Sequence, residues 1–522
     1  MSYEYDLNGN KTKQTDVTGK TTEYIYDELD LLQEIRDGGK CITAFKYNDD
    51  GTIKEAVSAN GMKNLYSYDT DKNLISLNIN FNGKILAQNR YTYDHNGNRT
   101  EKQQLQGTTY YTYDSINQLT NVKYPDYEEQ LFYDKAGNRS KRIVNDVTEH
   151  YLYDKRNRLI RQVFQQPTGT TAKHYIYDNA GSLMNDGEKV YKNDGFNRVT
   201  QVTNNKGQVQ INRYDAEGLR YEMEENKKLV QFIFNENREV VVEQSNSDIK
   251  RLIRSYDLWA SESEPEKTWY HYASDEQGST IFITDEEKIC NKYDYDAWGN
   301  LTTCEEIIPN RYLYTGQQFD QITQQYYLRA RYYNPVIARF TQEDIYRGDG
   351  LNLYTYCDNN PVIYYDPSGY RKLTIREHAE NAIKDLGARL NVEVPKYTDA
   401  QLDILEEKLN KVVNGTFENS TKIGNACEEI TDYLMKDIYG YQSAIGKTLG
   451  NQGIDGIYYK VDKEGHITDV RFTETKYNTA QLGKVKSGAK QTSNRWYKEK
   501  RDQLKDKISK LKEKGVSITN NE

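Results

Sequence analysis

The chain has 522 residues, of which 36% are hydrophobic, 29% charged and 12% aromatic, and its formal net charge is −9. This length exceeds one ordinary hydrophobic core and predicts at least two domains. Its 47 tyrosines argue against a disordered chain, which would be poor in aromatic residues. No stretch approaches the apolar length that a membrane-spanning helix needs, and five scattered cysteines indicate neither a disulfide framework nor a zinc site.

The first part of the chain repeats one short motif about every twenty residues. The fullest copy is YTYDHNGNR at 91–99, and FYDKAGNR at 132–139 echoes it. Copies of the Y-x-Y-D type end at Asp6, Asp27, Asp69, Asp94, Asp114, Asp134, Asp154 and Asp178, an FKYN copy ends at Asn48, and weaker copies end at Asp194, Asp215 and Asp296.

The physics of one repeat predicts a β-hairpin. The alternation in Y-x-Y puts both rings on one face of a strand, and D-x-x-G-N supplies the hydrogen bonds and the positive φ of a tight turn. A buried tyrosine ring also needs a partner for its hydroxyl. One hairpin cannot bury a core, so we expect the units to lie side by side in a continuous sheet. The pattern leaves open whether that sheet closes as a tube, a propeller or a shell.

These repeats resemble the YD repeats of the RHS family, and the stretch YYLRARYYNPVIARFTQEDIYRGDGLNLYTYCDNNPVIYYDPSGY at 326–370 resembles its RHS-associated core. The resemblance implies a mainly β protein, in which residues 1–325 form a hollow shell from a spiral antiparallel β-sheet. It implies that residues 326–370 plug one end, and that a variable C-terminal domain, often a toxin, follows. It further implies a secreted or cell-surface protein, a toxin that acts in the cytoplasm of a target cell, and a cognate immunity protein. Because the chain starts within a repeat, we expect it to be a fragment of a longer protein.

In RHS proteins of the toxin-complex type, the core is an autoprotease that uses two aspartates and an arginine. By resemblance, Asp344 and Asp366 match the aspartates, Arg331 matches the arginine, and the cut would follow Tyr370. Two carboxyl groups that share one proton can divide general acid and base work. The sequence departs from the family pattern, because no proline follows Asp344 and Tyr370 replaces the usual leucine. The alternative is structural: Asp366 starts a turn, Gly369 supplies a positive φ and Asp344 caps a loop.

The sequence becomes helical after the core. Helical spacing at 374–390 and 398–415 predicts a spacer at 371–418 that carries no chemistry. The predicted final domain, 419–522, opens with a helix at 420–440. Net charge is about +4 over residues 371–522 and about +7 over 481–522 alone, whereas residues 1–370 carry about −13. A basic end on an acidic chain favours a nucleic-acid partner, although a solvated helix face would look the same.

A hairpin is predicted after this helix, with strands at 454–461 and 467–477. The second strand places Glu474 and Lys476 on the same face as Val470 and Phe472. A carboxylate and an ammonium beside an apolar face cost free energy unless they are paired or bind a cation. Metal-dependent cleavage of a phosphodiester would use them, because carboxylates hold Mg²⁺ or Mn²⁺, the metal activates water and a lysine stabilises charge.

The same region resembles the PD-(D/E)XK nucleases. Asp455, Glu474 and Lys476 fall on the D…E-x-K positions, and Glu428 falls on the glutamate of the first helix, although its neighbour Glu429 could serve instead. Ile454 stands in place of the proline in the motif. The resemblance implies a nuclease that requires Mg²⁺ or Mn²⁺ and cleaves DNA or tRNA. The segment AKQTSNRWY at 489–497 contributes three candidate nucleic-acid contacts, which are Lys490, Gln491 and Arg495.

Two other functions fit the same residues. The chain could be a YD-repeat surface or adhesion protein that binds cell-surface glycans through its tyrosines, with a basic tail that is not catalytic. The tail could also bind nucleic acid without cleaving it. The Glu-x-Lys pattern alone is weak, because it recurs at 286–288 and 406–408. Convergence of Asp455, Glu474 and Lys476 in space is the feature that separates the nuclease from both alternatives.

Overall fold

The computed structural model describes residues 1–345 and 352–370, apart from Gly9, Asp50, Asp71, Lys72, Ser247, Tyr256 and Pro265. Of the remaining chain it describes residues 430, 433–439, 442–445, 456–461 and 467–473. The chain divides into two compact units, Met1–Lys372 and Leu373–Glu522. The two helices predicted at 374–390 and 398–415 lie outside the described residues.

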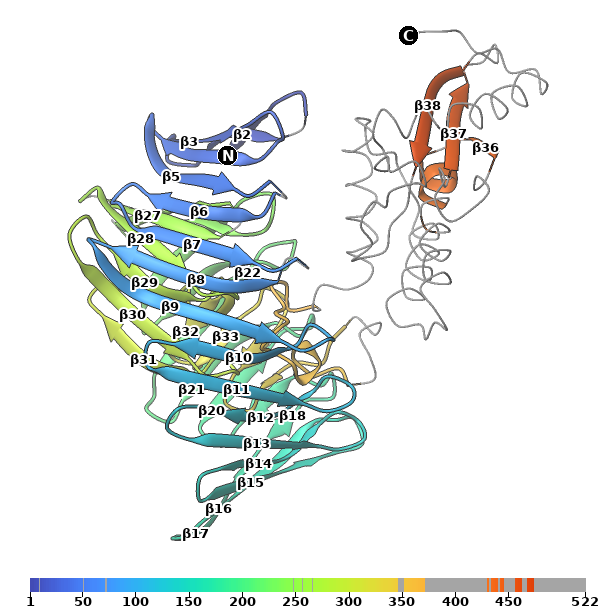
Figure 1. Cartoon of the computed structure of the whole chain (residues 1–522). Helices are drawn as coiled ribbons and strands as arrows, with labels where there is room; N and C mark the ends of the chain where they lie inside the picture. The colour runs from blue at the N-terminus through green and yellow to red at the C-terminus, as the bar shows by residue number, and fades with distance from the viewer. Residues whose placement is uncertain are drawn as a thin grey trace. The chain divides into compact units, whose positions relative to one another are not determined.

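The first large sheet has 17 strands, and each strand pairs antiparallel with the next one along the chain (Figure 1). Its strands are β1 (Ser2–Tyr5), β2 (Lys11–Thr15), β3 (Thr21–Tyr26), β4 (Leu32–Asp37), β5 (Lys40–Tyr47), β6 (Ile53–Ser58), β7 (Lys63–Tyr68), β8 (Leu74–Phe81), β9 (Lys84–Tyr93), β10 (Arg99–Gln104), β11 (Gly107–Tyr113), β12 (Leu119–Lys123), β13 (Glu128–Tyr133), β14 (Arg139–Val144), β15 (Val147–Tyr153), β16 (Leu159–Gln166) and β17 (Gly169–His174).

The second large sheet has 14 strands in the same consecutive antiparallel order. Its strands are β18 (Ile176–Tyr177), β19 (Leu183–Asn185), β20 (Lys189–Asn193), β21 (Val199–Asn204), β22 (Val209–Tyr214), β23 (Arg220–Glu225), β24 (Lys228–Phe234), β25 (Val240–Ser245), β26 (Asp248–Arg254), β27 (Leu258–Glu264), β28 (Thr268–Ser274), β29 (Thr280–Thr284), β30 (Ile289–Tyr295) and β31 (Leu301–Glu306). Both sheets are chains of hairpins, as the repeat predicts.

The tyrosines of each repeat point inward and link one hairpin to the one before it. In β15, Tyr151 is buried whereas the intervening Leu152 is exposed. The second tyrosine of a repeat donates its hydroxyl proton to a backbone carbonyl of the preceding hairpin. These bonds are Tyr93 to Leu74 at 2.8 Å, Tyr113 to Arg99 at 2.6 Å, Tyr133 to Leu119 at 2.6 Å and Tyr153 to Arg139 at 2.8 Å. The expected hydroxyl partner is therefore main chain, and it recurs along the sheet.

The predicted turn chemistry is confirmed at the hairpin ends. Asp94 accepts hydrogen bonds from the backbone N–H groups of Asn96 and Asn98, both at 2.9 Å. Gly97 supplies the left-handed residue with φ +80°, and Asn117 takes the same role in the next repeat with φ +63°. The side chain of Asn98 donates to that of Asn117 at 2.8 Å, so adjacent turns are also tied to each other.

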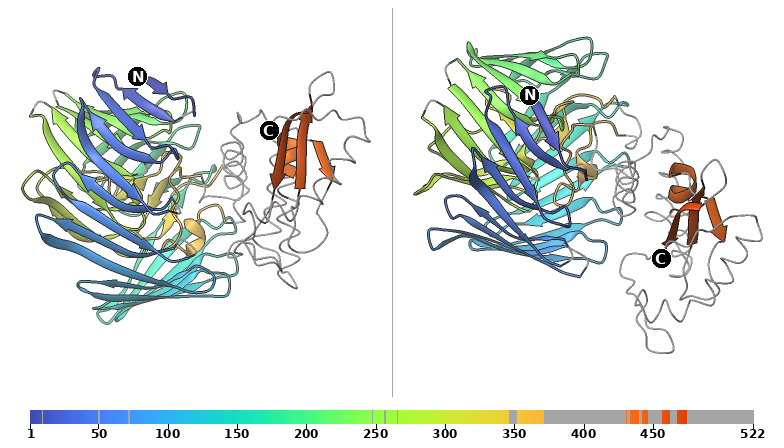
Figure 2. Two further views of the ribbon diagram at one scale, coloured as in Figure 1. Left: turned by 45° about the horizontal axis from the view of Figure 1, so that its top comes forward. Right: turned by 90° about the horizontal axis from the view of Figure 1, so that it is seen from above.

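The two large sheets pack their inner faces together. One core cluster joins Phe45 of β5 to Trp259 of β27, whose rings meet edge to face at a centroid distance of 4.9 Å. Beside it, the buried guanidinium of Arg251 pairs with Asp16 at 2.5 Å and Asp37 at 2.6 Å. Figure 2 shows the sheets curving around the segment that follows β31. The fold class is a YD-repeat β-shell, as expected.

The segment after β31 lies inside the shell and is mostly buried, although Val336, Ile345 and Tyr370 are exposed. It contains η1 (Tyr314–Gly316), a four-stranded sheet and η2 (Cys357–Asn359). The strands are β32 (Gln318–Asp320), β33 (Gln325–Tyr327), β34 (Tyr332–Asn334) and β35 (Arg339–Phe340). Arg220 of β23 pairs with Asp320 of β32 at 2.5 Å, and neither side chain is exposed. This pair fastens the inner segment to the second large sheet.

The described part of the second unit is a short helical turn and a three-stranded antiparallel sheet. The elements are η3 (Leu434–Ile438), β36 (Gln442–Ile445), β37 (Gly456–Val461) and β38 (Ile467–Thr473). The predicted hairpin is confirmed over β37 and β38, and Ile457 lies opposite Phe472. Strand β36 has no counterpart in the sequence prediction. Among the described residues, no helix has the length and apolarity needed to cross a membrane.

Candidate functional sites

The three predicted self-cleavage residues lie together in the inner segment. Arg331 stands just before β34 with its side chain 6% exposed, and its Nη2 atom lies 2.7 Å from the Asp344 carboxylate and 3.7 Å from that of Asp366. The guanidinium carbon also lies 3.6 Å from the centroid of the Phe340 ring. One buried cation therefore contacts two carboxyl groups that are distant from each other in the sequence.

Arg331 also contacts the main chain at the predicted cleavage position. Its Nε–H donates to the carbonyl oxygen of Gly369, and its Nη2–H donates to the carbonyl oxygen of Tyr370 at 3.1 Å. The second of these carbonyls belongs to the bond between Tyr370 and Arg371, although Arg371 itself lies outside the described residues. A hydrogen-bond donor on that oxygen would stabilise negative charge there if the bond were hydrolysed.

The side chain of Asp366 is 1% exposed, and it contacts both Arg331 and the backbone of the turn that follows it. One of its oxygens accepts hydrogen bonds from the backbone N–H groups of Ser368 at 3.0 Å and Gly369 at 2.8 Å. Burial raises the pKa of this carboxyl group, and Arg331 opposes that rise. Gly369 has φ +71°, and a β-carbon there would lie 2.4 Å from the carbonyl oxygen of Leu328. The structural roles expected of Asp366 and Gly369 are therefore present, together with the contacts of Asp366 to Arg331.

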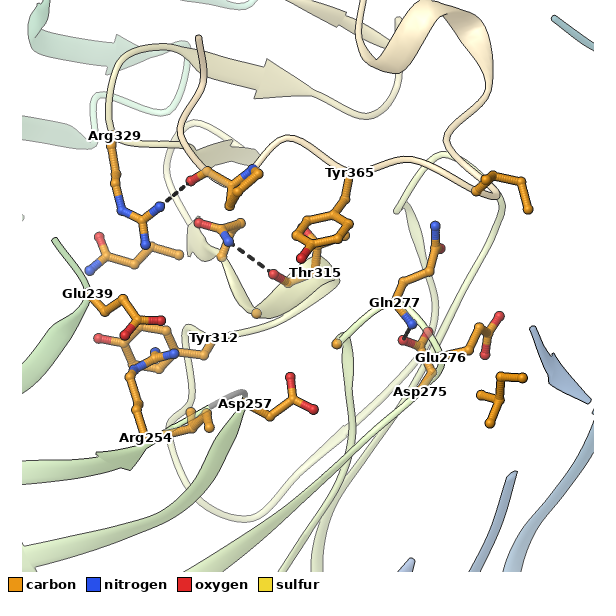
Figure 3. Close-up of a pocket in the computed structure, with 18 of the residues that line it drawn as sticks. Glu239, Arg254, Asp257, Asp275, Glu276, Gln277, Tyr312, Thr315, Arg329 and Tyr365 are labelled. Carbon is orange, nitrogen blue, oxygen red and sulfur yellow. Dashed lines mark hydrogen bonds between the residues drawn. The ribbon is translucent and has the colours of Figure 1, made fainter. Parts of the chain in front are cut away.

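A polar cavity of about 560 Å³ lies between the inner face of the shell and the inner segment (Figure 3). Asp257 and Asp275 line it, and burial raises the pKa of each to about 6. Arg254 and Arg329 lie among the other lining residues. Arg329 donates to the carbonyl oxygen of Pro367 at 2.5 Å, so the last turn before the cleavage position forms part of the cavity wall.

A third acidic residue of this cavity, Glu276, stays ionised through its own partners. Arg99 lies 2.6 Å from its carboxylate and Lys102 lies 3.0 Å away. Burial would raise the pKa of Glu276, but Lys102 and Arg99 outweigh burial and hold the pKa at about 2. None of these residues belongs to a site predicted from the sequence. The turn SDEQGS at 274–279 keeps the Asp-x-x-Gly spacing of the repeats, but the Tyr-x-Tyr pair at 270–272 lies two residues further from the aspartate than in the repeats.

The predicted nuclease residues lie outside the described residues. These are Glu428, Asp455, Glu474, Lys476, Lys490, Gln491 and Arg495. The hairpin next to two of them is described, and Gly456 pairs with Thr473 across β37 and β38. Asp455 directly precedes Gly456 in the sequence, and Glu474 directly follows Thr473. Within the described part of the chain, no group of three or more histidine, cysteine or acidic residues is arranged to hold a metal ion.

Two family models match the first unit. The model described as Teneurin YD-shell matches residues 104–362, and the model described as RHS Repeat matches residues 5–40. Together with the repeated hairpins, these matches decide the family. The chain belongs to the RHS/YD-repeat proteins.

Similar RHS/YD-repeat proteins include two Bacillus nucleases. The tRNA3(Ser)-specific nuclease WapA of Bacillus spizizenii and the tRNA nuclease WapA of Bacillus subtilis strain 168 are each 32% identical to this chain over 371 residues, which is 67% of the chain. The chain spans only 16% of the length of either protein.

A solved structure supports the shell fold. The crystal structure of TcdB2-TccC3 matches 70% of this chain with a TM-score of 0.56 and 20% sequence identity, and the match covers 22% of that chain. At this level of identity the likeness concerns the fold alone.

Proposed function

We propose that this chain is part of an RHS toxin, in which the YD-repeat shell carries a C-terminal nuclease that cleaves tRNA or DNA of a competing cell. The observation that carries the proposal is the 32% identity to the WapA proteins, which are named as tRNA nucleases. That similarity covers the shell region, so it supports the architecture of a toxin carrier more directly than the chemistry of the tail. A secreted location, action in the target cytoplasm and a cognate immunity protein belong to the same proposal.

The proposed nuclease centre is Asp455, Glu474 and Lys476, with Glu428 as a further carboxylate. Support comes from the hairpin register, because Asp455 and Glu474 are the sequence neighbours of the paired residues Gly456 and Thr473. Carboxylates at the ends of two paired strands suit Mg²⁺ or Mn²⁺, which prefer oxygen ligands. A bound ion would supply an activated water molecule, and the lysine would stabilise developing charge. The basic stretch with Lys490, Gln491 and Arg495 would then contact phosphates.

The nuclease is tested with the purified full chain. Wild type and Glu474→Ala are incubated with plasmid DNA and with total tRNA, in Mg²⁺ and in EDTA. Degradation that requires both the metal ion and Glu474 is the expected result. Glu286→Ala is the matched control, because Glu286 also stands two residues before a lysine but belongs to the shell, and this variant should remain active. Intact nucleic acid in every lane from a folded protein would contradict the proposal.

We further propose that the inner segment cleaves the chain between Tyr370 and Arg371. Support comes from Arg331, which contacts the carbonyl oxygen of Tyr370 and both aspartates. With one carboxyl group ionised and the other protonated, the pair can activate water and protonate the leaving amine, as in aspartic proteases.

Mass spectrometry of the purified full chain tests self-cleavage. The expected product is a fragment that begins at Arg371, and Asp366→Asn should abolish it. Asp134→Asn is the matched control, since Asp134 likewise accepts two turn N–H groups, at 2.8 and 2.9 Å, but lies in a repeat. An uncut wild-type chain, or equal cutting in Asp366→Asn, would rule out this mechanism.

A further inference from the structure

We propose that Thr355 and Asp366 hold a buried water molecule beside Arg331, and that this water is the nucleophile for the Tyr370–Arg371 bond. Thr355 then acts as a positioning residue. The inference rests on the proposed self-cleavage, and it adds a residue that neither the aspartates nor the arginine of the core motif would indicate.

The first observation is a small polar cavity at the site. Its lining includes Arg331, Asp344, Thr355 and Asp366, and it offers about 10 Å³ of space for the centre of a water molecule. That is about the smallest volume that accommodates one water molecule. A polar cavity of this size is suited to a single water and is too small for any larger ligand.

The second observation is a pair of unsatisfied oxygen atoms in the lining. Asp366 uses Oδ1 for its turn hydrogen bonds, whereas its Oδ2 is buried without a hydrogen-bond partner among the described residues. The hydroxyl oxygen of Thr355 is likewise buried, and within the described chain it also has no hydrogen-bond partner. A buried polar group that stays unpaired destabilises the fold, and buried waters commonly satisfy two to four such groups. One water in the shared cavity would satisfy both.

The backbone holds Thr355 in place at this cavity. An isolated β-bridge pairs Thr355 with Arg339 at the end of β35, and the Thr355 N–H donates to the carbonyl oxygen of Asn352 at 3.3 Å. The hydroxyl therefore comes from a segment that is paired with β35, whereas Asp366 comes from the turn just before Tyr370. Two supports from separate segments fix the position of a bound water better than one carboxylate does.

The reaction balances with this water alone. The two carboxyl groups share one proton: the ionised one removes a proton from the water as its oxygen bonds to the carbonyl carbon of Tyr370. Arg331 stabilises the negative charge that forms on the carbonyl oxygen. The protonated carboxyl group then gives its proton to the nitrogen of Arg371 as the C–N bond breaks. The products are a carboxyl group on Tyr370 and a free amine on Arg371, and the pair again holds one proton.

Two variants of Thr355 in the full chain test the inference. Thr355→Val keeps the shape but removes the hydroxyl, and we expect self-cleavage to slow by roughly 10- to 100-fold. Thr355→Ser keeps the hydroxyl and should cleave within about twofold of wild type. The matched control is Thr43→Val, because Thr43 in β5 also has a buried hydroxyl without a hydrogen-bond partner in the described structure but lies far along the chain from Tyr370. Thr43→Val should cleave like wild type.

A crystal structure of the full chain supplies a readout that is independent of cleavage. We expect one ordered water within hydrogen-bond distance of Thr355 Oγ1 and Asp366 Oδ2, present in Thr355→Ser and lost in Thr355→Val. Normal cleavage by Thr355→Val, or a cavity without water density in the wild type, would overturn the inference and leave self-cleavage intact. If the wild type is never cut, the proposed self-cleavage and the nucleophile fail together, even where the water is seen. If Thr355→Val does not fold, slow cleavage by Thr355→Ser with the water in place would also overturn it.

Discussion

Protonation of His271 should destabilise the shell in mild acid. His271 lies in β28, is fully buried, and neither ring nitrogen has a hydrogen-bond partner among the described residues. Burial, assisted by the nearby charge of Lys40, lowers its pKa from 6.5 to about 4. The unfolded chain therefore binds a proton more readily than the folded chain, and stability falls as the pH drops from about 6.5 towards 4.

The size of the effect follows from the two pKa values. A difference of one pKa unit corresponds to about 1.4 kcal/mol, so the contribution of His271 to the free energy of unfolding decreases by about 3 kcal/mol between neutral pH and pH 4. Three buried carboxyl groups act in the opposite direction. Burial raises the pKa values of Asp257, Asp275 and Asp296 to about 6, so each gains stability as the pH falls from about 6 towards 3.8.

The comparison that isolates the histidine is between wild type and His271→Leu, because the carboxyl groups are common to both. Urea unfolding is followed by tryptophan fluorescence at pH 7 and at pH 4. The difference in unfolding free energy between the two proteins should shift by about 3 kcal/mol in favour of the variant at pH 4. His95→Leu, at an exposed turn position, is the control and should follow wild type. Parallel pH dependence of wild type and His271→Leu would refute the reasoning.

Three further predictions concern the shell and the turn before Tyr370. Tyr133→Phe should lower the free energy of unfolding by about 1 kcal/mol in urea titrations, because it removes a bond to a backbone carbonyl, and the exposed Tyr110→Phe should change it little. Gly369→Ala should abolish the fragment beginning at Arg371 in mass spectra, since its β-carbon would collide with backbone, and an unchanged fragment would contradict the geometry. Arg220→Met should cost about 3–5 kcal/mol of unfolding free energy, because it leaves the buried Asp320 carboxylate without a cation. Adding Asp320→Leu should recover most of that loss, whereas additive losses would contradict the pairing.

The sequence predicts the local features of the shell well because they depend on neighbouring residues. Alternation in Y-x-Y determines which rings face inward, and the Asp-x-x-Gly-Asn pattern determines the turns, as at Asp94 and Gly97. The division into two facing sheets and the position of the inner segment cannot be predicted from neighbouring residues. They depend on contacts such as Arg251 with Asp16, which are 235 residues apart, and no periodic pattern records such a pairing.

The two candidate sites also differ in how far the sequence predicts them. The RHS resemblance identified Arg331, Asp344 and Asp366, and the structure adds that Arg331 contacts the carbonyl oxygen of Tyr370. Thr355 carries no signal in the sequence, since only the fold brings its hydroxyl to the cavity of Asp366. The nuclease residues lie outside the described part of the chain, so Asp455, Glu474 and Lys476 stay predictions that rest on spacing and hairpin register.

The contact between Arg331 and Tyr370 indicates which end of the chain the shell would retain after the proposed cleavage. Before the cut, the guanidinium donates to a neutral carbonyl oxygen at 3.1 Å. Hydrolysis converts that carbonyl into a carboxylate, and a hydrogen bond between two charged groups is roughly twice as strong as one to a neutral acceptor. The new C-terminus at Tyr370 is therefore held more tightly than the same carbonyl in the intact chain. The geometry thus favours retention of the new C-terminus by the shell, as the proposed toxin carrier would require.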